Sequence, residues 1–252
     1  MNYLIDHCEP FLGEEGNIWM KLEHCGRYLF ARDQIKARGL ETVLDIACAE
    51  GYGLELLEEY GLKTFGADIN RNYLKTAEAR STAVLRELDV DNDEWPYAFR
   101  DLDAVVCFET IEHVHDPERL MRNLSGSLKA GGLLLLSVPS EEYEKTDENG
   151  INFDPFHLNI FTREEILRML DTNGFELEGI YGQALCNNMY IAEKAAIERG
   201  ALSDETESQM STADSLFKYE RDYLITLSQL MGYPDQHRIE ESYSHIFIAT
   251  KK

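Results

Sequence analysis

The sequence has few cysteines and a shortage of basic residues. Its five cysteines form no CxxC pair and their number is odd, so neither a disulfide framework nor a cysteine zinc site is predicted. Against 47 aspartates and glutamates stand 24 lysines and arginines, and the formal net charge is −23. A negative field of that size repels phosphate backbones and anionic lipids. We therefore expect neither a nucleic acid nor a membrane as a partner.

Long apolar runs are absent as well. The longest, Ala104 to Phe108, is far too short to span a bilayer. The first residues lack the basic start and apolar stretch of a signal peptide, so we predict a cytoplasmic protein. Of the 252 residues, 44% are hydrophobic and 28% charged, which is ordinary globular usage and excludes disordered, collagen-like and coiled-coil classes.

Short apolar segments alternate with amphipathic ones from about residue 42 to 181. This alternation is typical of βα units, which build a parallel sheet covered on both faces. The predicted strands are Thr42–Ala47, Lys63–Asp68, Ala83–Leu88, Leu102–Phe108, Leu133–Val138, Phe175–Tyr181 and Ser244–Ala249. Among the helices, one begins at the Asp116 cap and is expected to end at Gly131-Gly132. Another is expected to begin with a capping box formed by Thr162 and Glu165.

Two regions fall outside this alternation. Residues 1–41 precede the first strand and contain a predicted helix at Trp19–Ala37, so we expect an N-terminal helical cap. Residues 42–252 form the main domain, and 186–236 interrupt it before the last strand as a helical insertion, expected to act as a lid. Helical sequence within the insertion covers 189–197 and 213–230.

The most informative segment is VLDIACAEGYG, residues 43–53. An apolar strand runs into a tight turn of small residues, so that a ligand can approach the backbone at the carboxyl end of the strand. The dinucleotide pattern GxGxxG is not met, because Ala47 and Ala49 occupy small positions. Asp45 and Glu50 would repel a pyrophosphate. Both acids favour a ligand that carries an ammonium or sulfonium charge.

Two further acids follow the next predicted strands. Asp68 closes the second strand, where an acid can accept hydrogen bonds from both hydroxyls of a ribose. Asp89 follows the third strand, where it can meet an adenine amino group. Each acid taken singly is more often a helix cap or a solvated loop residue. Together with Asp45, however, they place three acids at successive strand ends, which favours a nucleoside ligand.

These segments together resemble the class I S-adenosylmethionine-dependent methyltransferases that act on small molecules or sugars. Residues 43–51 resemble the family's first motif, VLDxGxGxG, with Ala47 and Ala49 where glycines are usual, and FETIEHV at 108–114 resembles the segment after its fourth strand. The resemblance covers about residues 40–181 and the last strand. It implies an α/β fold with a Rossmann-like, doubly wound, mostly parallel sheet of seven strands, and S-adenosylmethionine as the cofactor.

The resemblance also implies which residues contact the cofactor. They are Asp45, Ala47, Gly51 and Gly53 around the methionine moiety, Asp68 and Ile69 at the ribose and adenine, Asp89 and Val90 at the adenine edge, and Phe108 and Glu109 as the floor. Glu50 is added to this set because its negative charge favours the positively charged sulfonium. On the leading helix, Arg27 or Tyr28 is expected to meet the cofactor carboxylate.

Methyl transfer from a sulfonium needs positioning and an acceptor lone pair, and a hydroxyl acceptor also benefits from a general base. The candidates are Glu112, His113 and His157. We favour His157, which lies in the segment FDPFHLNIFT before the Thr162 helix. The alternatives are that His157 only holds this loop and that His113 only forms the cofactor wall. His113 and His115 lack a partner set at ligand spacing, so no metal site is predicted.

Three functions are compatible with these residues. The first is methylation of a hydroxyl on a small molecule or sugar, such as a natural product, a quinone precursor or a glycan. The second is N-methylation of a cationic amine, which the acidic loop at 141–148 would attract. The third is a catalytically silent subunit that binds S-adenosylmethionine and supports an active partner. A homodimer is left open.

Overall fold

A computed structural model describes residues 18–142, 144, 155–200 and 221–252. The chain divides into two compact units, one holding residues 31–181 and 244–252 and the other holding the described residues of 1–30 and 182–243. The elements are α2 (Ile18–Ala37), β1 (Thr42–Ile46), α3 (Tyr52–Glu58), β2 (Lys63–Asp68), α4 (Arg71–Arg80), β3 (Val84–Glu87), η1 (Tyr97–Phe99), β4 (Leu102–Phe108), η2 (Ile111–His113), α5 (Pro117–Ser127), β5 (Leu128–Pro139), α6 (Arg163–Thr172), β6 (Phe175–Gln183), α7 (Leu185–Glu198), α9 (Arg221–Met231), η4 (Ile239–Glu241) and β7 (Ser244–Lys251).

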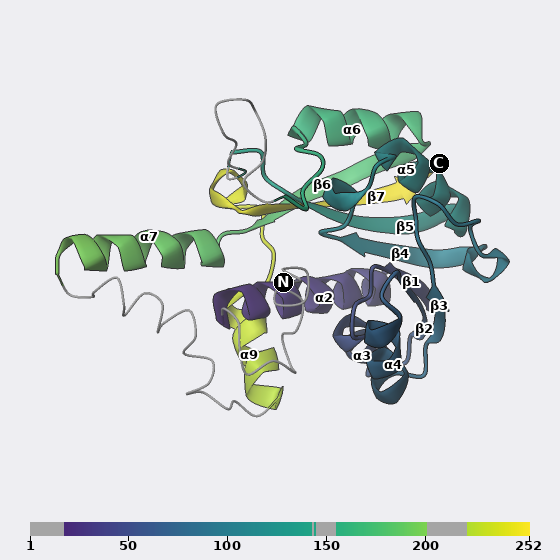
Figure 1. The fold of residues 1–252 in the computed structure, drawn as a ribbon, viewed down its shortest axis with the longest axis horizontal. Coiled ribbons are helices and arrows are strands. Elements are labelled where there is room, and N and C mark those ends of the chain that lie inside the picture. The colour runs from purple at the N-terminus through teal and green to yellow at the C-terminus, as the bar shows by residue number, and fades with distance from the viewer. Residues whose placement is uncertain (1–17, 143, 145–154, 201–220) are drawn as a thin grey trace. The chain divides into compact units, whose positions relative to one another are not determined.

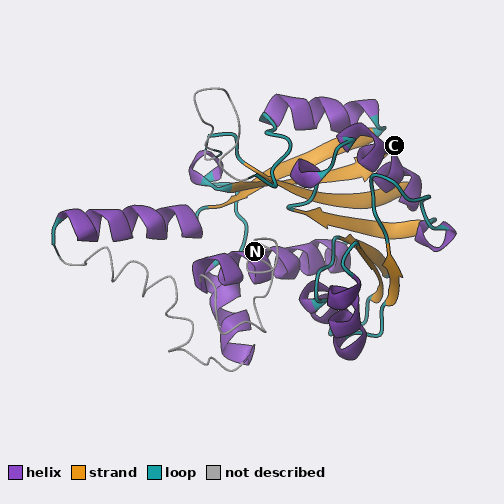
Figure 2. Ribbon diagram, viewed as in Figure 1, coloured by secondary structure: helices purple, strands orange, loops and turns teal. Residues whose placement is uncertain are grey.

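A seven-stranded sheet in the order β3-β2-β1-β4-β5-β7-β6 forms the centre of the larger unit. β1 pairs in parallel with both β2 and β4, and β7 runs antiparallel to β5. Figure 2 shows the strands side by side. The predicted α/β fold with a mostly parallel, seven-stranded sheet is therefore confirmed. The strand order reverses between β1 and β4. In open α/β sheets, ligands bind at such a point, outside the carboxyl ends of the strands, and the turns after β1 and β4 lie there.

Helices cover both faces of this sheet. In Figure 1, α5 and α6 lie together on one face, whereas α3 and α4 lie on the other. The central strands are buried, as expected for a parallel sheet covered on both sides. Helix α5 turns Leu120, Met121 and Leu124 into the main core, where they join side chains of β4 and β5.

Element boundaries follow the sequence signals with one clear exception. β2 and β4 have the predicted bounds, and the Thr162 capping box is present, with Glu165 N donating to Thr162 Oγ1 at 3.1 Å. The expectation that Gly131-Gly132 ends the preceding helix is wrong. The helix ends at Ser127, because Leu128 pairs with Leu102 of β4 and the glycines then lie inside β5.

The smaller unit contains residues 18–30 of α2 together with α7 and α9. Gln183 joins its parts: the side-chain amide donates to the carbonyl oxygens of Glu23, at 2.7 Å, and Gly232, and its oxygen accepts from Arg27 Nε at 2.9 Å. A Cβ on Gly26 would lie 2.1 Å from the Gly232 oxygen, so two glycines permit this close backbone approach. The predicted helix at 213–230 begins outside the described residues. The cap and lid roles stay predictions.

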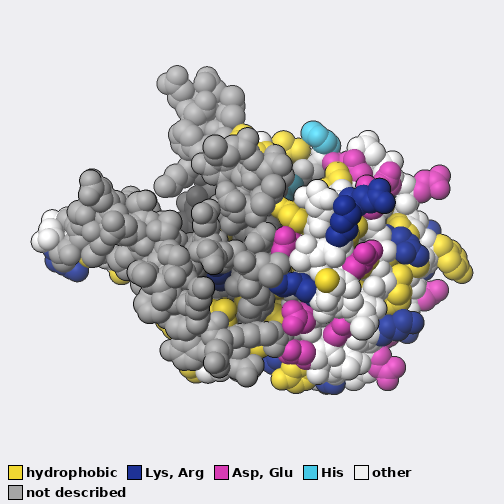
Figure 3. Space-filling view, turned by 60° about the horizontal axis from the view of Figure 1, so that its bottom comes forward, with side chains coloured by type: hydrophobic (Ala, Val, Ile, Leu, Met, Phe, Trp, Pro, Cys, Tyr) yellow, Lys and Arg dark blue, Asp and Glu magenta, His cyan; other side chains and the backbone are white. Residues whose placement is uncertain are grey.

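The described surface mixes charges of both signs. Acidic and basic side chains both occur on the described part of the face in Figure 3. None of the described helices combines the length and the apolar character that crossing a bilayer requires.

Asp103 links the starts of β1 and β4 to the start of β5. Its carboxylate accepts hydrogen bonds from Thr42 N at 2.9 Å, Thr42 Oγ1 at 2.8 Å and Lys129 Nζ at 2.8 Å. Burial alone would raise the pKa of Asp103, but these hydrogen bonds outweigh it and lower the pKa to about 2. The carboxylate therefore stabilises the fold in its ionised form.

We predict that Asp103→Asn lowers the free energy of unfolding by roughly 2 kcal/mol at neutral pH. Because the folded pKa lies below the unfolded one, this contribution is complete above about pH 4 and is lost as the pH falls towards 2. Urea unfolding of the wild type and the variant from pH 2 to 7 measures it, with exposed Glu94→Gln as the control. A stability difference that stayed constant over this range would contradict the account.

Candidate functional site

The turn after β1 has left-handed backbone at every second residue. The φ angles are 59° at Ala47, 47° at Ala49 and 80° at Gly51. Ala49 N donates to the Asp68 carboxylate at 2.9 Å, which ties the turn to the end of β2. A Cβ on Gly51 would lie 2.7 Å from the Cβ of Ala77, so glycine is required where α3 packs on α4. The turn thus presents backbone and one exposed methyl group, that of Ala47, at the carboxyl edge of the sheet.

The predicted acids differ in their surroundings. Asp68 is buried, and burial raises its pKa although Asn70 and Ala49 donate backbone N–H groups to it. The next residue, Ile69, is 65% exposed, so an open aliphatic surface lies beside a carboxylate, as the binding of a nucleoside requires. Asp45 is completely buried within β1.

Asp89 begins a local turn, in which Asn92 N and Asp93 N donate to its carbonyl oxygen. Its carboxylate accepts from Asn92 Nδ2 at 2.8 Å and from Asp91 N at 2.9 Å, and the Asn92 hydrogen bond lowers its pKa. Val90 is partly buried against the main core. The predicted contacts of these two residues with adenine stay predictions.

Four other predicted cofactor residues occupy two parts of the chain. Gly53 is buried in the first turn of α3, and Glu50 precedes it, partly buried. Arg27 and Tyr28 are buried residues of α2 in the smaller unit, where Arg27 binds Gln183. Their predicted contact with the cofactor carboxylate stays a prediction.

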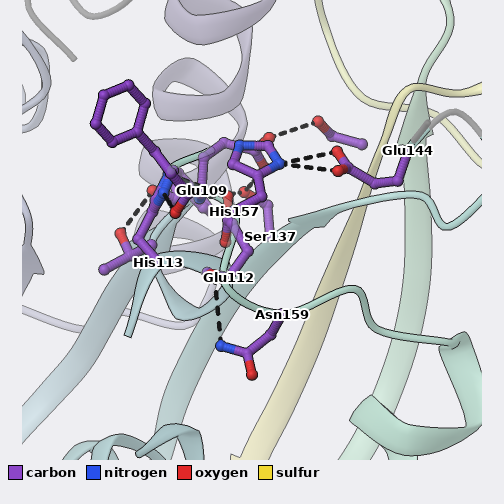
Figure 4. Close-up of polar contacts among 11 residues, drawn as sticks. Glu109, Glu112, His113, Ser137, Glu144, His157 and Asn159 are labelled. Atoms are coloured by element: carbon purple, nitrogen blue, oxygen red, sulfur yellow. Dashed lines mark hydrogen bonds and ion pairs between the residues drawn. The ribbon is translucent and has the colours of Figure 1, made fainter. Parts of the chain in front are cut away.

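Glu109 follows β4 and is fixed by two serines. Its φ is 44°, and its carboxylate accepts hydrogen bonds from Ser137 Oγ at 2.6 Å and Ser244 Oγ at 2.9 Å. These serines belong to β5 and β7, so Glu109 spans the ends of three adjacent strands (Figure 4). Phe108, directly before it, is buried.

Beside Glu109 lies the histidine–carboxylate cluster, by which we mean Glu112, His113 and His157. η2 carries the first two residues, and the loop before α6 carries His157. One ligand atom from each of the three lies within 4.8 Å of the others, and the two imidazole centroids are 4.8 Å apart. The Glu112 side chain is 2% exposed, His157 10% and His113 28%.

Both imidazoles of the cluster have defined tautomers when neutral. His113 Nδ1 lies 2.9 Å from the carbonyl oxygen of Phe156, and His157 Nδ1 lies 2.9 and 3.0 Å from the two carboxylate oxygens of Glu144. Because a carbonyl oxygen or a carboxylate only accepts, each Nδ1 must donate. In the neutral ring the lone pair then lies on Nε2. Figure 4 shows the contact between His157 and Glu144.

Asn159 holds the His157 loop against η2. Its backbone N donates to Glu112 O at 3.0 Å, and its side-chain amide donates to Val114 O at 2.7 Å. This contact explains how residues far apart in the sequence meet in one cluster. His157 supplies a partner close to His113 that the sequence does not place beside it, and the expectation that no metal binds stays a prediction.

Sequence reasoning also missed two supporting residues. The sequence pattern places Glu144 in an acidic loop, whereas in the structure its carboxylate accepts the His157 N–H. Asn159 lies two residues after His157 in a segment already singled out, and its amide was the available signal.

Comparisons with known proteins agree with this geometry. A family model described as a methyltransferase domain matches residues 20–179. A probable S-adenosylmethionine-dependent methyltransferase of Mycolicibacterium smegmatis is 28% identical over 82% of this chain and 76% of its own length. A ubiquinone biosynthesis O-methyltransferase of Idiomarina loihiensis is 27% identical over 56% of this chain, and the match covers 64% of that relative. Other curated relatives are matched over 51% to 64% of their own length.

Solved structures share the fold. Magnesium protoporphyrin IX methyltransferase from Synechocystis PCC 6803, determined with bound SAM, aligns with a TM-score of 0.58 at 13% identity. The alignment covers 100% of this chain and 92% of that one.

The left-handed backbone of Ala47 leads to a stability prediction. Left-handed φ is unfavourable for residues with a Cβ and acceptable for glycine, and the Ala47 methyl is exposed. We expect Ala47→Gly to raise the free energy of unfolding by about 0.5–1 kcal/mol. Ala79→Gly, at an exposed helical position, should lower it by about the same amount. Thermal unfolding of both variants tests this, and destabilisation by Ala47→Gly would refute it.

Proposed function

Because the chain belongs to the class I S-adenosylmethionine-dependent methyltransferases, we propose that it methylates a hydroxyl group of a small molecule. The histidine–carboxylate cluster carries this proposal. A hydroxyl is a weak nucleophile until it loses its proton, and it therefore benefits from a base beside the methyl donor. The cluster follows β4, the strand next to β1 in the sheet. The similarity to an O-methyltransferase of ubiquinone biosynthesis supports the same acceptor class.

The turn after β1 suits the cofactor. S-adenosylmethionine supplies an electrophilic methyl group on a sulfonium and becomes S-adenosylhomocysteine. Small side chains at 47, 49 and 51 allow close approach to the backbone. Asp68 would bind the ribose hydroxyls and exposed Ile69 the adenine face. The acidic side chains near this edge complement the positive charge of the sulfonium.

His157 is the residue that we expect to receive the acceptor's proton. Its Nδ1–H is held by Glu144, so that Nε2 presents a lone pair in a fixed orientation. The Glu144 carboxylate would also stabilise the imidazolium formed when Nε2 takes up a proton, as a buried acid does beside a catalytic histidine. Glu144 and His157 are 5% and 10% exposed, and this strengthens their interaction by limiting solvent screening.

The pairing of Glu144 with His157 argues against N-methylation of a cationic amine. Of the acidic residues proposed to attract such an amine, Glu144 faces His157, and Glu141 and Glu142 are exposed. Exposed carboxylates are screened by salt and bind a cation weakly. A base is also of less use to an amine, which reacts once it is bound in its neutral form.

We predict that His157→Gln lowers kcat by about 10²–10⁴-fold for a hydroxyl acceptor. Binding of S-adenosylhomocysteine should stay within twofold of wild type, because His157 is not part of the turn after β1. The assay screens hydroxylated small molecules and their amine analogues for methyl transfer, and then measures kcat against pH with an accepted substrate.

Exposed His115→Gln is the matched control, because its backbone N and not its ring makes the described contact with Asp91. It should retain wild-type kcat. Equal rates for both variants at every pH would remove His157 from proton transfer. If only the amine analogues were methylated, the acceptor would be an amine and the proposal of a hydroxyl acceptor would be wrong.

A further inference from the structure

We propose that Asp91 couples binding of the cofactor to the position of the segment that carries Glu112 and His113. Asp91 lies in the loop after β3, and its carboxylate binds the backbone directly before α5. It is a positioning residue, because it acts through the residues that it holds. The coupling rests on the proposed function, since it requires a cofactor at the ends of β1 and β2 and an acceptor beside η2.

The loop after β3 begins beside the acid that closes β2. Asp68 pairs with Glu87 in the register of β2 and β3, and Leu88 N donates to Asp68 O at 3.1 Å. Asp89 follows Leu88 directly. A nucleoside whose ribose binds the Asp68 carboxylate would therefore have its base close to the first residues of this loop, Asp89 and Val90.

Asp91 ties the same loop to the residues between η2 and α5. Its carboxylate accepts hydrogen bonds from His115 N at 3.0 and 3.1 Å and from Asp116 N at 3.1 Å. Asp116 is the N-cap of α5, so helix geometry offers these two N–H groups no partner. Hydrogen bonds to a carboxylate are stronger than those between neutral groups. One side chain thus fixes the start of the helix.

Further contacts make the loop move as one piece with this attachment. Asp91 N donates to the Asp89 carboxylate at 2.9 Å, and Asp89 N donates to the Asp93 carboxylate at 2.8 Å. The Asp93 carbonyl oxygen accepts from Arg119 Nη2 of α5 at 2.6 Å. The loop is therefore a closed turn attached to α5 at two points. A ligand that fixes Asp89 would fix Asp91 through direct contact.

Asn159 holds the segment 112–116 from its other side. Its backbone N donates to Glu112 O at 3.0 Å and its side-chain amide to Val114 O at 2.7 Å. Carbonyl groups of the segment are thus held by the loop before α6, and N–H groups by the loop after β3. Ordering of the loop after β3 by a bound nucleoside would fix Glu112 and His113 on the acceptor side. Such coupling is reciprocal, so the acceptor should also tighten binding of the cofactor.

Amide hydrogen exchange of the full chain, with and without S-adenosylhomocysteine, tests the coupling. In the wild type, S-adenosylhomocysteine should slow exchange at His115 and Asp116 by about threefold or more, because the loop that binds them opens less often. In Asp91→Ala these amides should exchange about 10-fold faster, and S-adenosylhomocysteine should no longer change their rate. Asp91→Asn keeps one acceptor oxygen and should give an intermediate response.

Glu94→Ala is the matched control, because Glu94 is an exposed acid of the same loop. It should respond to S-adenosylhomocysteine as the wild type does. Thermal unfolding verifies that each variant is folded under the conditions of the exchange measurement. If Asp91 only stabilised the fold, Asp91→Ala would unfold at a lower temperature and still show slower exchange at residues 115 and 116 with S-adenosylhomocysteine. That outcome overturns the coupling.

Calorimetry with S-adenosylhomocysteine and a methyl-transfer assay separate this inference from the proposed function. If the wild type binds S-adenosylhomocysteine without any change of exchange at residues 115 and 116, the coupling is overturned and cofactor binding stands. If exchange slows as expected but no hydroxyl is methylated, the link from cofactor to segment stands and the proposed function fails. A folded wild type that does not bind S-adenosylhomocysteine would overturn both.

Discussion

The parallel pairing of β1 with both β2 and β4 is the constraint on which both parts of the site depend. Parallel strands end at the same edge of the sheet, so the turn after β1, the acid that closes β2 and η2 after β4 are all presented there. The strand order reverses between β1 and β4, so the helices that follow these strands lie on opposite faces of the sheet. A crevice forms between them at this edge. The topology therefore brings the turn after β1 and the histidine–carboxylate cluster to the same edge of the sheet.

Hydrogen bonds then fix the loops that the topology brings together. Asp68 holds the left-handed turn through Ala49 N, although burial raises the pKa of its carboxyl. On the other side, Asn159 docks the His157 loop on η2. In both places a polar side chain satisfies backbone groups that a loop leaves without strand partners. Loops fixed in this way need little rearrangement if a ligand binds at this edge, which is pre-organisation.

Much of this fold was predictable from local signals. The apolar runs gave β2 and β4 with correct bounds, and Thr162 with Glu165 formed the expected capping box. The helix end predicted at Gly131 was wrong. The pairing of Leu128 with Leu102 ends the helix earlier and begins β5. Tertiary pairing of strands is a long-range interaction, and residue propensity does not contain it.

The candidate site was predictable in its residues and less so in its arrangement. Strand ends located Asp68 and Ile69, because the sheet pattern places such positions at one edge. The partnership of His157 with Glu144 and its approach to His113 depend on how one loop folds over another. No periodicity encodes such a contact, so the cluster emerged only from the three-dimensional structure.

A crystal structure of the full chain with S-adenosylhomocysteine tests the account's central claim most directly. The account predicts that the cofactor lies along the turn after β1, with the ribose at Asp68 and the thioether sulfur facing the histidine–carboxylate cluster. Hydroxyl activation by the cluster requires this orientation. A sulfur that points away from His113 and His157, or a cofactor bound at another edge of the sheet, would contradict the account.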